Sequence, residues 1–400
     1  MAPSQLAWLD YSEQERRRAL DVISLFQEQG TIDELGIGSV RDSLADRFFP
    51  GTSTVQTRAA YFFFVPWIYL DLERRRVASA DIQRRARVSE IRLIESLKEA
   101  RDWNGLIGSQ AGKNLSRLPS NIYWNGLYLW GLRPFPGSQP EYHRSLDGFY
   151  RSMRLARHEE EVGAEVPSPN WHPAIPPPPD SFPEVATFKL RKGDAEFLRE
   201  KIMYRQTGTL LAWLAEHSKA STDEMFVWNH PLAAKFPEPF RTELVHARRF
   251  SEVIEGSALL YNLMLAQAAD LEGLVEQYDN RLFDWAEATR AELPDLRNWD
   301  RAGFRALVGR RAKDSAWQFI DTWLDLATDP AFLRAVARNK GGRELIRARE
   351  AFLKGSRARL GNRRALSDWN GQSYAASLDY RWGRAEALLN DIQRGRRQHA

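Results

Sequence analysis

The stretch that decides the fold runs over residues 44–76, LADRFFPGTSTVQTRAAYFFFVPWIYLDLERRR. It joins a short polar loop to an aromatic run interrupted by one proline, Pro66, and it ends on three arginines. The run over residues 61–69 is apolar nearly all round, which is typical of a helix covered on most sides by other helices. Residues 44–76 therefore predict a buried helix that organises a helical domain.

The polar loop before this aromatic run has two interpretations. Thr52, Ser53 and Thr54 are residue types that cap helix N-termini, so we expect them to begin the helix. Pro66 lacks a backbone N–H, and we expect it to kink or break the helix after residue 64. The loop is also a candidate pocket, which consists of Thr52, Ser53, Thr54, Gln56 and Arg58.

Composition limits the class of protein. A length of 400 residues suggests two or three domains, and 43% hydrophobic residues are enough for buried cores. The chain has no cysteine, which excludes disulfides and cysteine-based metal sites and fits a reducing compartment. Its N-terminus shows no export signal, and no apolar run reaches the length of about 20 residues that a spanning helix needs. We therefore expect a cytoplasmic protein without a membrane partner.

Periodicity indicates a mainly α fold of two helical domains joined by a proline-rich linker, with at most a few short strands. The expected helices include residues 12–29, 39–49, 81–101 and 342–360, and the expected strand is 185–190. Residues 166–184 hold eight prolines, which favours a semi-rigid spacer. The expected domains are 1–165 and 185–400, flanking the linker 166–184. No alternation of strands and helices suggests a parallel sheet.

Residues 90–131 outline a helix-turn-helix, with a short helix at 110–118 and a reader helix at 121–130. A reader helix shows polar side chains on its outer face. This one offers only Asn121 and Asn125 among aromatic and apolar residues, so ordinary three-helix packing is the alternative.

No motif in the chain carries a recognisable chemistry. The seven histidines lack metal-ligand spacing, and the serine-hydrolase elbow and the kinase loops are absent. Residues 108–113, GSQAGK, have one residue too few for a phosphate-binding loop and no hydroxyl residue after the lysine. We therefore predict no catalytic residue, metal or cofactor, although a cryptic nuclease or nucleotide hydrolase stays open.

The charge is unevenly distributed along the chain. Residues 166–300 carry 14 basic and 21 acidic side chains, whereas residues 301–400 carry 21 basic and 10 acidic ones, a net charge of +11. Such asymmetry is expected of a surface that binds nucleic acid or an acidic partner. The alternative is that the basic last quarter docks on the acidic middle of the same chain.

The basic charge concentrates in residues 341–366, GGRELIRAREAFLKGSRARLGNRRAL. On a helical wheel Arg349 falls among apolar residues, so its guanidinium should meet a carboxylate or several carbonyls. Glu350 can pair with Lys354 four residues later. More arginines follow than are needed to balance the negative end of the helix dipole. We therefore favour the hypothesis that they contact phosphate groups. The predicted nucleic-acid contacts are Arg343, Arg347, Lys354, Arg357, Arg359, Arg363 and Arg364.

Three stretches resemble the marks of a bacterial family known only as a domain of unknown function. They are residues 44–69, residues 111–132 (AGKNLSRLPSNIYWNGLYLWGL) and residues 357–382 (RARLGNRRALSDWNGQSYAASLDYRW). The resemblance covers nearly the whole chain. It implies a gene neighbourhood of phage defence, beside helicases, methyltransferases or phospholipase D-like nucleases, and it assigns no catalytic residue.

These observations predict a non-enzymatic subunit of a bacterial antiphage defence system that binds nucleic acid, a DNA-processing partner, or both. The alternative is a protein–protein adaptor or sensor scaffold for a helicase, nuclease or methyltransferase, without direct DNA binding.

Overall fold

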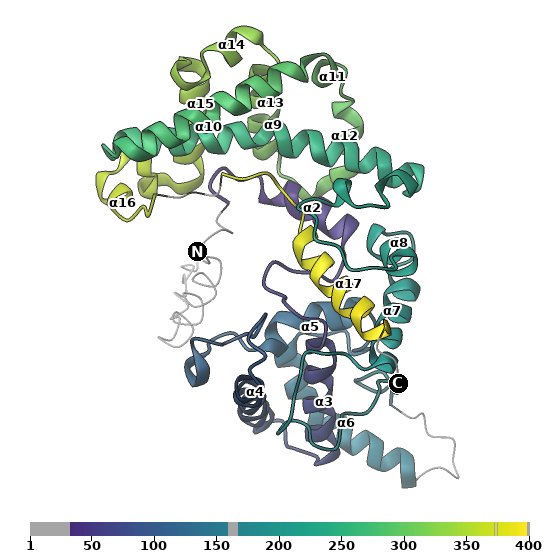
Figure 1. Ribbon diagram of the computed structural model, residues 1–400. Coiled ribbons are helices and arrows are strands. Elements are labelled where there is room, and N and C mark those ends of the chain that lie inside the picture. Colours follow the sequence, from purple (N-terminus) through teal and green to yellow (C-terminus); the bar gives the residue numbers. More distant parts are fainter. Residues whose placement is uncertain (1–32, 159–166, 372, 374, 398–400) are drawn as a thin grey trace, which may run out of the picture. The chain divides into compact units, whose positions relative to one another are not determined.

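The protein is mainly α-helical. The computed structural model describes residues 33–158, 167–371, 373 and 375–397, which form 16 α-helices and several 3₁₀ turns (Figure 1). No strand occurs within these ranges, so the strand expected at 185–190 is wrong. The helix expected at 12–29 lies outside the described residues. None of the described helices is long and apolar enough to cross a membrane.

The chain divides into two compact units. Unit 1 comprises Met1–Ser43 and Thr242–Leu378, and unit 2 comprises Leu44–Arg241 and Asp379–Ala400. This division differs from the boundary expected at residues 166–184, because that proline-rich segment lies entirely inside unit 2. There the Trp67 indole N–H donates to the carbonyl of Pro176 at 2.7 Å, and Phe182 stacks on Phe64 with ring centroids 5.7 Å apart. The segment thus packs against the aromatic run of residues 61–69.

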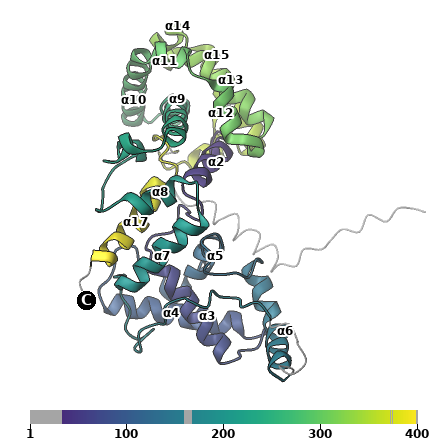
Figure 2. The same cartoon turned by 90° about the vertical axis from the view of Figure 1, so that its right-hand side faces the viewer.

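The core of unit 2 is built around helix α3 (Tyr61–Arg74), as the aromatic run predicts. Helices α4 (Ile82–Glu99) and α5 (Pro119–Leu129) pack against it (Figure 2). Phe62 stacks on Trp130 with centroids 4.0 Å apart and meets the ring of Tyr123 edge-on at 5.0 Å. Each such pair adds about 0.5–1.5 kcal/mol to the free energy gained from area burial.

Helix α3 departs from two expectations. It begins at Tyr61 after Ala60, without a side-chain cap, so the prediction that Thr52, Ser53 and Thr54 cap it is wrong. It also runs through Pro66 to its end, so the helix does not break after residue 64, and the alternative of a kink there stays a prediction. Pro66 is near the first turns, where a missing N–H removes one hydrogen bond, and packing on most sides holds the helix together.

The region between α4 and α5 is less helical than expected. Its only regular element among the described residues is the 3₁₀ turn η1 (Gly112–Asn114), so the short helix predicted at 110–118 is wrong. Tyr123, Trp124 and Leu127 of α5 are buried in the unit 2 core. Of the three helices predicted for the helix-turn-helix, the first and the last are present as α4 and α5, and the middle one is absent.

The other helices of unit 2 include α6 (Gln139–His158), α7 (Lys192–Arg205), α8 (Leu210–His217) and the C-terminal α17 (Trp382–Arg397). Helix α17 packs along α7, and the two lie side by side in Figure 1. The approach is close at Gly395, where an added Cβ would lie 2.8 Å from the Cβ of Ala195. Residues 382–397 therefore complete the fold of residues 44–241.

The longest helix of unit 1 is α9 (Glu238–Ala268). Its residues from Thr242 onward belong to unit 1. Helix α10 (Glu272–Ala291) lies against α9, where the ring of Trp285 covers Gly256 so closely that a Cβ there would meet the ring at 2.2 Å. The shorter helices follow: α2 (Gly38–Phe48, in unit 1 up to Ser43), α11 (Leu293–Arg297), α12 (Arg301–Val308), α13 (Asp314–Ala327), α14 (Pro330–Arg334), α15 (Lys340–Lys354) and α16 (Arg363–Ser367).

Candidate nucleic-acid interface

The arginine-rich segment (residues 343–364) is split between helix α15, two 3₁₀ turns and the start of α16. The side chain of Asn339 caps α15 by accepting a hydrogen bond from the N–H of Gly342 at 2.9 Å. The helix ends at Lys354 because Gly355 has φ 54°, in the left-handed region that favours glycine. One continuous helix over 342–360 is therefore wrong, and the later arginines lie on turns.

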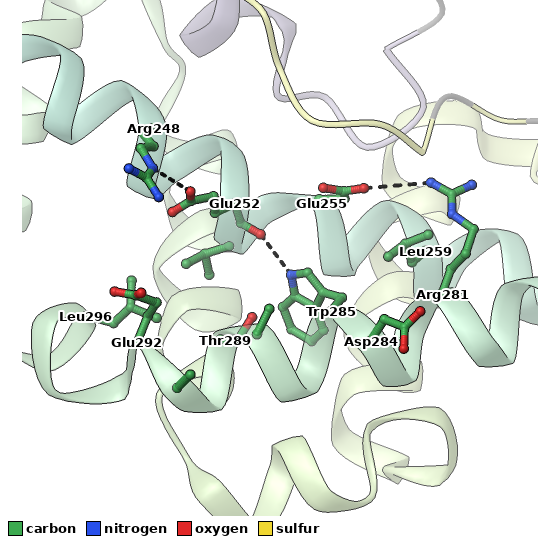
Figure 3. Close-up of a pocket in the computed structure, with 13 residues that line it drawn as sticks. Arg248, Glu252, Glu255, Leu259, Arg281, Asp284, Trp285, Thr289, Glu292 and Leu296 are labelled. Atoms are coloured by element: carbon green, nitrogen blue, oxygen red, sulfur yellow. Dashed lines mark hydrogen bonds and ion pairs between the residues drawn. The ribbon is translucent and has the colours of Figure 1, made fainter. Parts of the chain in front are cut away.

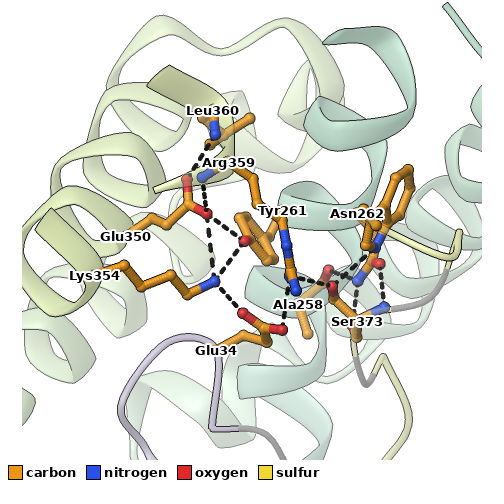
Figure 4. A network of polar contacts seen from close by, with 10 residues as sticks. Glu34, Ala258, Tyr261, Asn262, Glu350, Lys354, Arg359, Leu360 and Ser373 are labelled. Carbon is orange, nitrogen blue, oxygen red and sulfur yellow. Dashed lines mark hydrogen bonds and ion pairs between the residues drawn. The ribbon is translucent and has the colours of Figure 1, made fainter. Parts of the chain in front are cut away.

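A buried carboxylate joins these turns to α9 (Figure 4). Glu350 is fully buried and accepts hydrogen bonds from the hydroxyl of Tyr261 at 2.5 Å and from the backbone N–H groups of Arg359 and Leu360 at 2.8 and 3.0 Å. Lys354 approaches the same carboxylate at 3.3 Å, which confirms the pairing expected from the sequence. Glu350 thus fixes the path of the chain where the arginines begin.

A second carboxylate, Glu34, completes the network in unit 1. It pairs with the ammonium of Lys354 through one oxygen, and its other oxygen accepts from Arg359 Nη1 at 2.8 Å. Lys354 also donates to the hydroxyl of Tyr261 at 2.9 Å, and Arg359 Nη1 donates to the hydroxyl of Ser373 at 3.2 Å. Two of the seven predicted phosphate contacts are therefore bound to carboxylates of their own unit.

The charges in this network are fixed by its hydrogen bonds. Burial by itself raises the pKa of Glu350, but the donated hydrogen bonds and the charge of Lys354 outweigh it and hold the pKa below its usual value. Burial and the neighbouring carboxylate raise the pKa of the Tyr261 hydroxyl. Burial lowers the pKa of Arg359, and the hydrogen bond and charge of Glu34 more than reverse this. A phosphate group would compete with Glu34 for Lys354 and Arg359.

Arg349 is buried, as its position among apolar residues predicts. Only 6% of its surface is exposed, and its guanidinium donates to three carbonyls, those of Leu35 at 2.8 Å, Ser315 at 2.8 Å and Gly36 at 3.2 Å. Burial lowers the pKa of Arg349. This residue joins three segments of unit 1, which is the structural role that an unpaired buried charge requires.

The remaining predicted contacts differ from Lys354 and Arg359 in their exposure. Arg343 is half-buried and donates to the carbonyl of Ala337 and to the side chain of Gln267, both at 2.8 Å. The other four are exposed, and their guanidiniums form no ion pair with any other described residue. They are Arg347, Arg357, Arg363 and Arg364.

Most polar groups of the polar loop (residues 52–58) of unit 2 are hydrogen-bonded within the unit, whereas the buried hydroxyl of Ser53 has no partner among the described residues. The hydroxyl of Thr52 donates to the carbonyl of Phe49 at 2.7 Å. The amide of Gln56, whose residue is 1% exposed, donates to the carbonyl of Gly51 at 3.1 Å and accepts from the N–H of Ser53 at 3.2 Å. These contacts stabilise the loop itself, and the predicted binding role of the loop stays a prediction.

The same loop also anchors helix α17. Arg58 forms a bidentate pair with Asp391, with Nε and Nη2 at 2.9 and 3.0 Å from the two carboxylate oxygens. The N–H of Ala59 donates to the same carboxylate at 2.9 Å, and Arg384 donates to the carbonyl of Thr54 at 2.9 Å. The start of α3 and the C-terminal helix are thus held together by charge-assisted hydrogen bonds.

A cavity of about 580 Å³ lies between α9 and α10, and no motif in the sequence predicted it (Figure 3). Trp285 lines it and donates to the carbonyl of Glu252 at 2.8 Å. Arg248 pairs with Glu252 at 2.6 Å, and Arg281 lies 3.7 Å from Glu255. The only signal in the sequence is the acidic charge of residues 166–300. Among the described residues no group of three or more histidines and carboxylates is placed to hold a metal ion.

Fold and site together define a mainly α-helical protein with an exposed group of arginines. The chain belongs to a family of unknown function, DUF6361, whose match spans residues 3–395. This confirms the resemblance to a domain of unknown function over nearly the whole chain. No curated protein and no solved structure matches the chain.

Proposed function

We propose that this protein is a non-enzymatic subunit of a bacterial antiphage defence system and that it binds nucleic acid through phosphate contacts made by unit 1. The observation that carries the proposal is the set of four exposed arginines, Arg347, Arg357, Arg363 and Arg364. They lie in the unit 1 part of the basic last quarter, residues 301–378, which carries 16 basic and 7 acidic side chains, a net charge of +9. The defence setting rests on the gene neighbourhood that the family resemblance implies.

Phosphate recognition fits these four side chains because a guanidinium presents paired N–H donors that match two phosphate oxygens. Such contacts carry no base information, so binding would be independent of sequence. Neutralising four phosphates on duplex DNA gives a slope of about −3.6 for log affinity against log salt concentration. The expected signature is therefore weak specificity and a steep dependence on salt.

The test is fluorescence anisotropy of a labelled duplex of arbitrary sequence, titrated with the protein at several salt concentrations. The variant R347E/R357E/R363E/R364E should lose binding, and single Arg-to-Ala changes should each lower the salt slope by about 1. Because the four side chains have no ion-pair partner among the described residues, the variants should stay folded.

A matched control changes the net charge of the protein by the same amount but at arginines of unit 2. Arg84, Arg85, Arg151 and Arg154 are exposed on unit 2, so replacing all four by Glu alters the net charge by the same amount. This control should weaken binding far less than the unit 1 variant. Equal loss in both variants, or no salt-sensitive binding to duplex DNA, single-stranded DNA or RNA, refutes the proposal.

The cavity between α9 and α10 favours a second candidate function, that of a protein–protein adaptor without direct DNA binding. Four carboxylates line it, two of them paired with arginines, and Trp285 provides an apolar wall. A basic or aromatic side chain of a helicase, nuclease or methyltransferase subunit would fit such a lining. Asp284 and Glu292 are the lining carboxylates without a paired arginine among the described residues.

The adaptor is tested by purifying the tagged protein from its native cells with and without nuclease treatment. A partner that stays bound after nuclease treatment, survives the four Arg-to-Glu changes and is lost in D284K/E292K supports the adaptor. A partner that dissociates with the nucleic acid supports direct binding instead.

A further inference from the structure

A second cavity, of about 650 Å³, lies in unit 2 beside the C-terminal end of helix α8. Its walls come from the last turn of α8, the loop that follows it, and residues 230–235. None of the described residues that line it is acidic, and its polar lining is basic or neutral. The residues that matter here are Trp213, His217, Ser218, Lys219, His230 and Lys235.

Ser218 gives the cavity a hydroxyl group without a partner. The residue is 6% exposed, and its Oγ is buried without a hydrogen bond to any described residue. Its backbone N–H is satisfied, because it donates to the carbonyl of Leu214 at 2.9 Å. A buried hydroxyl without a partner is costly, so a ligand oxygen that accepts from Ser218 would remove this cost.

His230 gives the cavity a donor whose direction is fixed by the backbone. The N–H of Leu232 donates to its Nδ1 at 3.0 Å, so the hydrogen of the neutral ring is on Nε2. Burial lowers the pKa of His230, which favours this neutral form. The ring is itself buried, with 5% of the residue exposed, and its Nε2–H is the donor that it can offer to a ligand in the cavity.

Positive charge and a flat ring complete the lining. Lys219 and Lys235 are exposed at the cavity and bring two ammonium groups. His217 stacks on Trp213 with ring centroids 4.2 Å apart and planes at 10°, and its Nδ1 lies 2.9 Å from the Trp213 carbonyl. The carboxylate of Glu216 lies 3.8 Å from the same nitrogen and belongs to an exposed side chain outside the cavity lining.

We infer that this cavity binds a small organic phosphate, with Ser218, His230 and the two lysines around the phosphate group and the Trp213–His217 stack beside a planar ring. Several N–H and O–H donors with two cations and no lining carboxylate suit a dianionic tetrahedral group. The volume exceeds what inorganic phosphate fills and lies in the range of cofactor pockets, about 300–1,000 Å³. The inference is independent of the arginines of unit 1.

The test is isothermal titration of the full-length protein with AMP, pyrophosphate, inorganic phosphate and adenosine. AMP should bind at least tenfold more tightly than adenosine, and pyrophosphate and phosphate should compete with it. If adenosine binds as tightly as AMP, or if AMP, pyrophosphate and phosphate all fail to bind, the inference is wrong. Acetate serves as a further arm, because competition by acetate equal to that by phosphate would point to a carboxylate site and overturn it.

The variants locate the binding. Ser218→Ala removes a hydroxyl without a protein partner, so the variant should keep its melting temperature and lose at least fivefold in AMP affinity. The variant K219Q/K235Q should lose at least tenfold, whereas the matched control K189Q/K192Q, with two exposed lysines outside the cavity lining, should bind AMP normally. Unchanged affinity in Ser218→Ala and K219Q/K235Q overturns the assignment.

A further arm separates this site from the proposed nucleic-acid surface. The cavity variants should leave duplex binding unchanged, and R347E/R357E/R363E/R364E should leave AMP binding unchanged. If the cavity variants abolish binding to duplex or single-stranded DNA, the cavity reads nucleic-acid phosphates and the small-molecule inference fails. Loss of duplex binding in the unit 1 variant alone leaves the two sites independent.

Discussion

The polar loop of unit 2 and the arginine-rich segment of unit 1 both place many polar side chains in a short stretch of chain, and the two use them differently. In the loop, Thr52, Gln56 and Arg58 are all bound to other groups of unit 2. In the arginine-rich segment, Lys354 and Arg359 are bound to Glu34. The guanidinium groups of four further arginines of that segment have no partner among the described residues.

This difference teaches that a high number of polar side chains in a short stretch of chain does not by itself mark a binding site. A polar side chain that is already hydrogen-bonded in the fold must lose that partner before it can bind a ligand. The exposed arginines lose only contacts with water when they meet a phosphate. The comparison therefore predicts large effects on stability where partners exist and small effects where they do not.

The largest effect is expected from Asp391→Ala in unit 2. The change leaves Arg58 without its bidentate partner and the N–H of Ala59 without an acceptor, and only 3% of the Asp391 side chain is exposed. Breaking such a buried pair costs about 3–5 kcal/mol in the free energy of unfolding. Urea unfolding followed by circular dichroism measures it.

The control for this prediction is Asp71→Ala, which removes ion pairs with two exposed arginines, Arg74 and Arg75. That change should cost less than about 1 kcal/mol. Similar losses in the two variants would show that the loop is not held by its buried pair, and the contrast between the two regions would fail.

The second effect concerns Glu90, a fully buried carboxylate of unit 2. Burial raises its pKa to about 7, although Ser120 donates to it from the backbone N–H at 2.8 Å and from the hydroxyl at 2.7 Å. Because the folded pKa lies above the ordinary value of 4.5, the stability that Glu90 contributes is fully present below pH 4.5 and is lost as pH rises through 7. The loss is on the order of 3 kcal/mol.

Glu90→Gln imitates the protonated acid, so it should remove this loss. The difference in unfolding free energy between variant and wild type should change in favour of the variant between pH 4.5 and 7.5. Burial lowers the pKa of the nearby His143 to about 4, which acts in the opposite direction in both proteins and cancels in the difference. A difference independent of pH would contradict the raised pKa.

The third effect concerns Glu350, the buried carboxylate of unit 1, whose pKa is lowered. A lowered folded pKa contributes stability that is present above the ordinary value of 4.5 and is lost as pH falls through the folded pKa. Glu350→Gln should therefore cost about 2 kcal/mol near pH 7, and much less at pH 3. Unfolding curves at both values check this, and a larger cost at pH 3 than at pH 7 would contradict it.

The smallest effect on stability is expected from the exposed arginines. R347E/R357E/R363E/R364E should change the unfolding free energy by less than about 1 kcal/mol, as exposed charges generally do. Arg359→Ala, which leaves Glu34 with Lys354 alone, should cost more than the four changes together. The reverse order would show that the exposed arginines have structural partners and would remove them as candidate phosphate contacts.

Part of the fold follows from local pattern. Residues 61–74 form the buried helix that their aromatic run predicts, and residues 82–99 form the predicted amphipathic helix. Local signals failed where packing or one glycine decides the outcome. Pro66 is accommodated within α3, Gly355 ends α15 early, and residues 110–118 form only a 3₁₀ turn.

The candidate sites follow the same rule. The need of Arg349 for oxygen partners is evident from its place among apolar residues, and the Glu350–Lys354 pair from their spacing. The cavities could not be predicted. The walls of the cavity between α9 and α10 come from two segments, residues 248–259 and 281–296, and the unpaired hydroxyl of Ser218 becomes significant only once it is buried.

By itself the sequence determined the mainly α class, the buried helix at residues 61–74 and the concentration of positive charge after residue 300. Only the tertiary structure decided which of those charges remain exposed. Lys354 meets Glu34 across 320 positions of the chain, and Arg58 meets Asp391 across 333. Helical periodicity is a local property of neighbouring residues, whereas ion pairing depends on distances that exist only after the chain has folded.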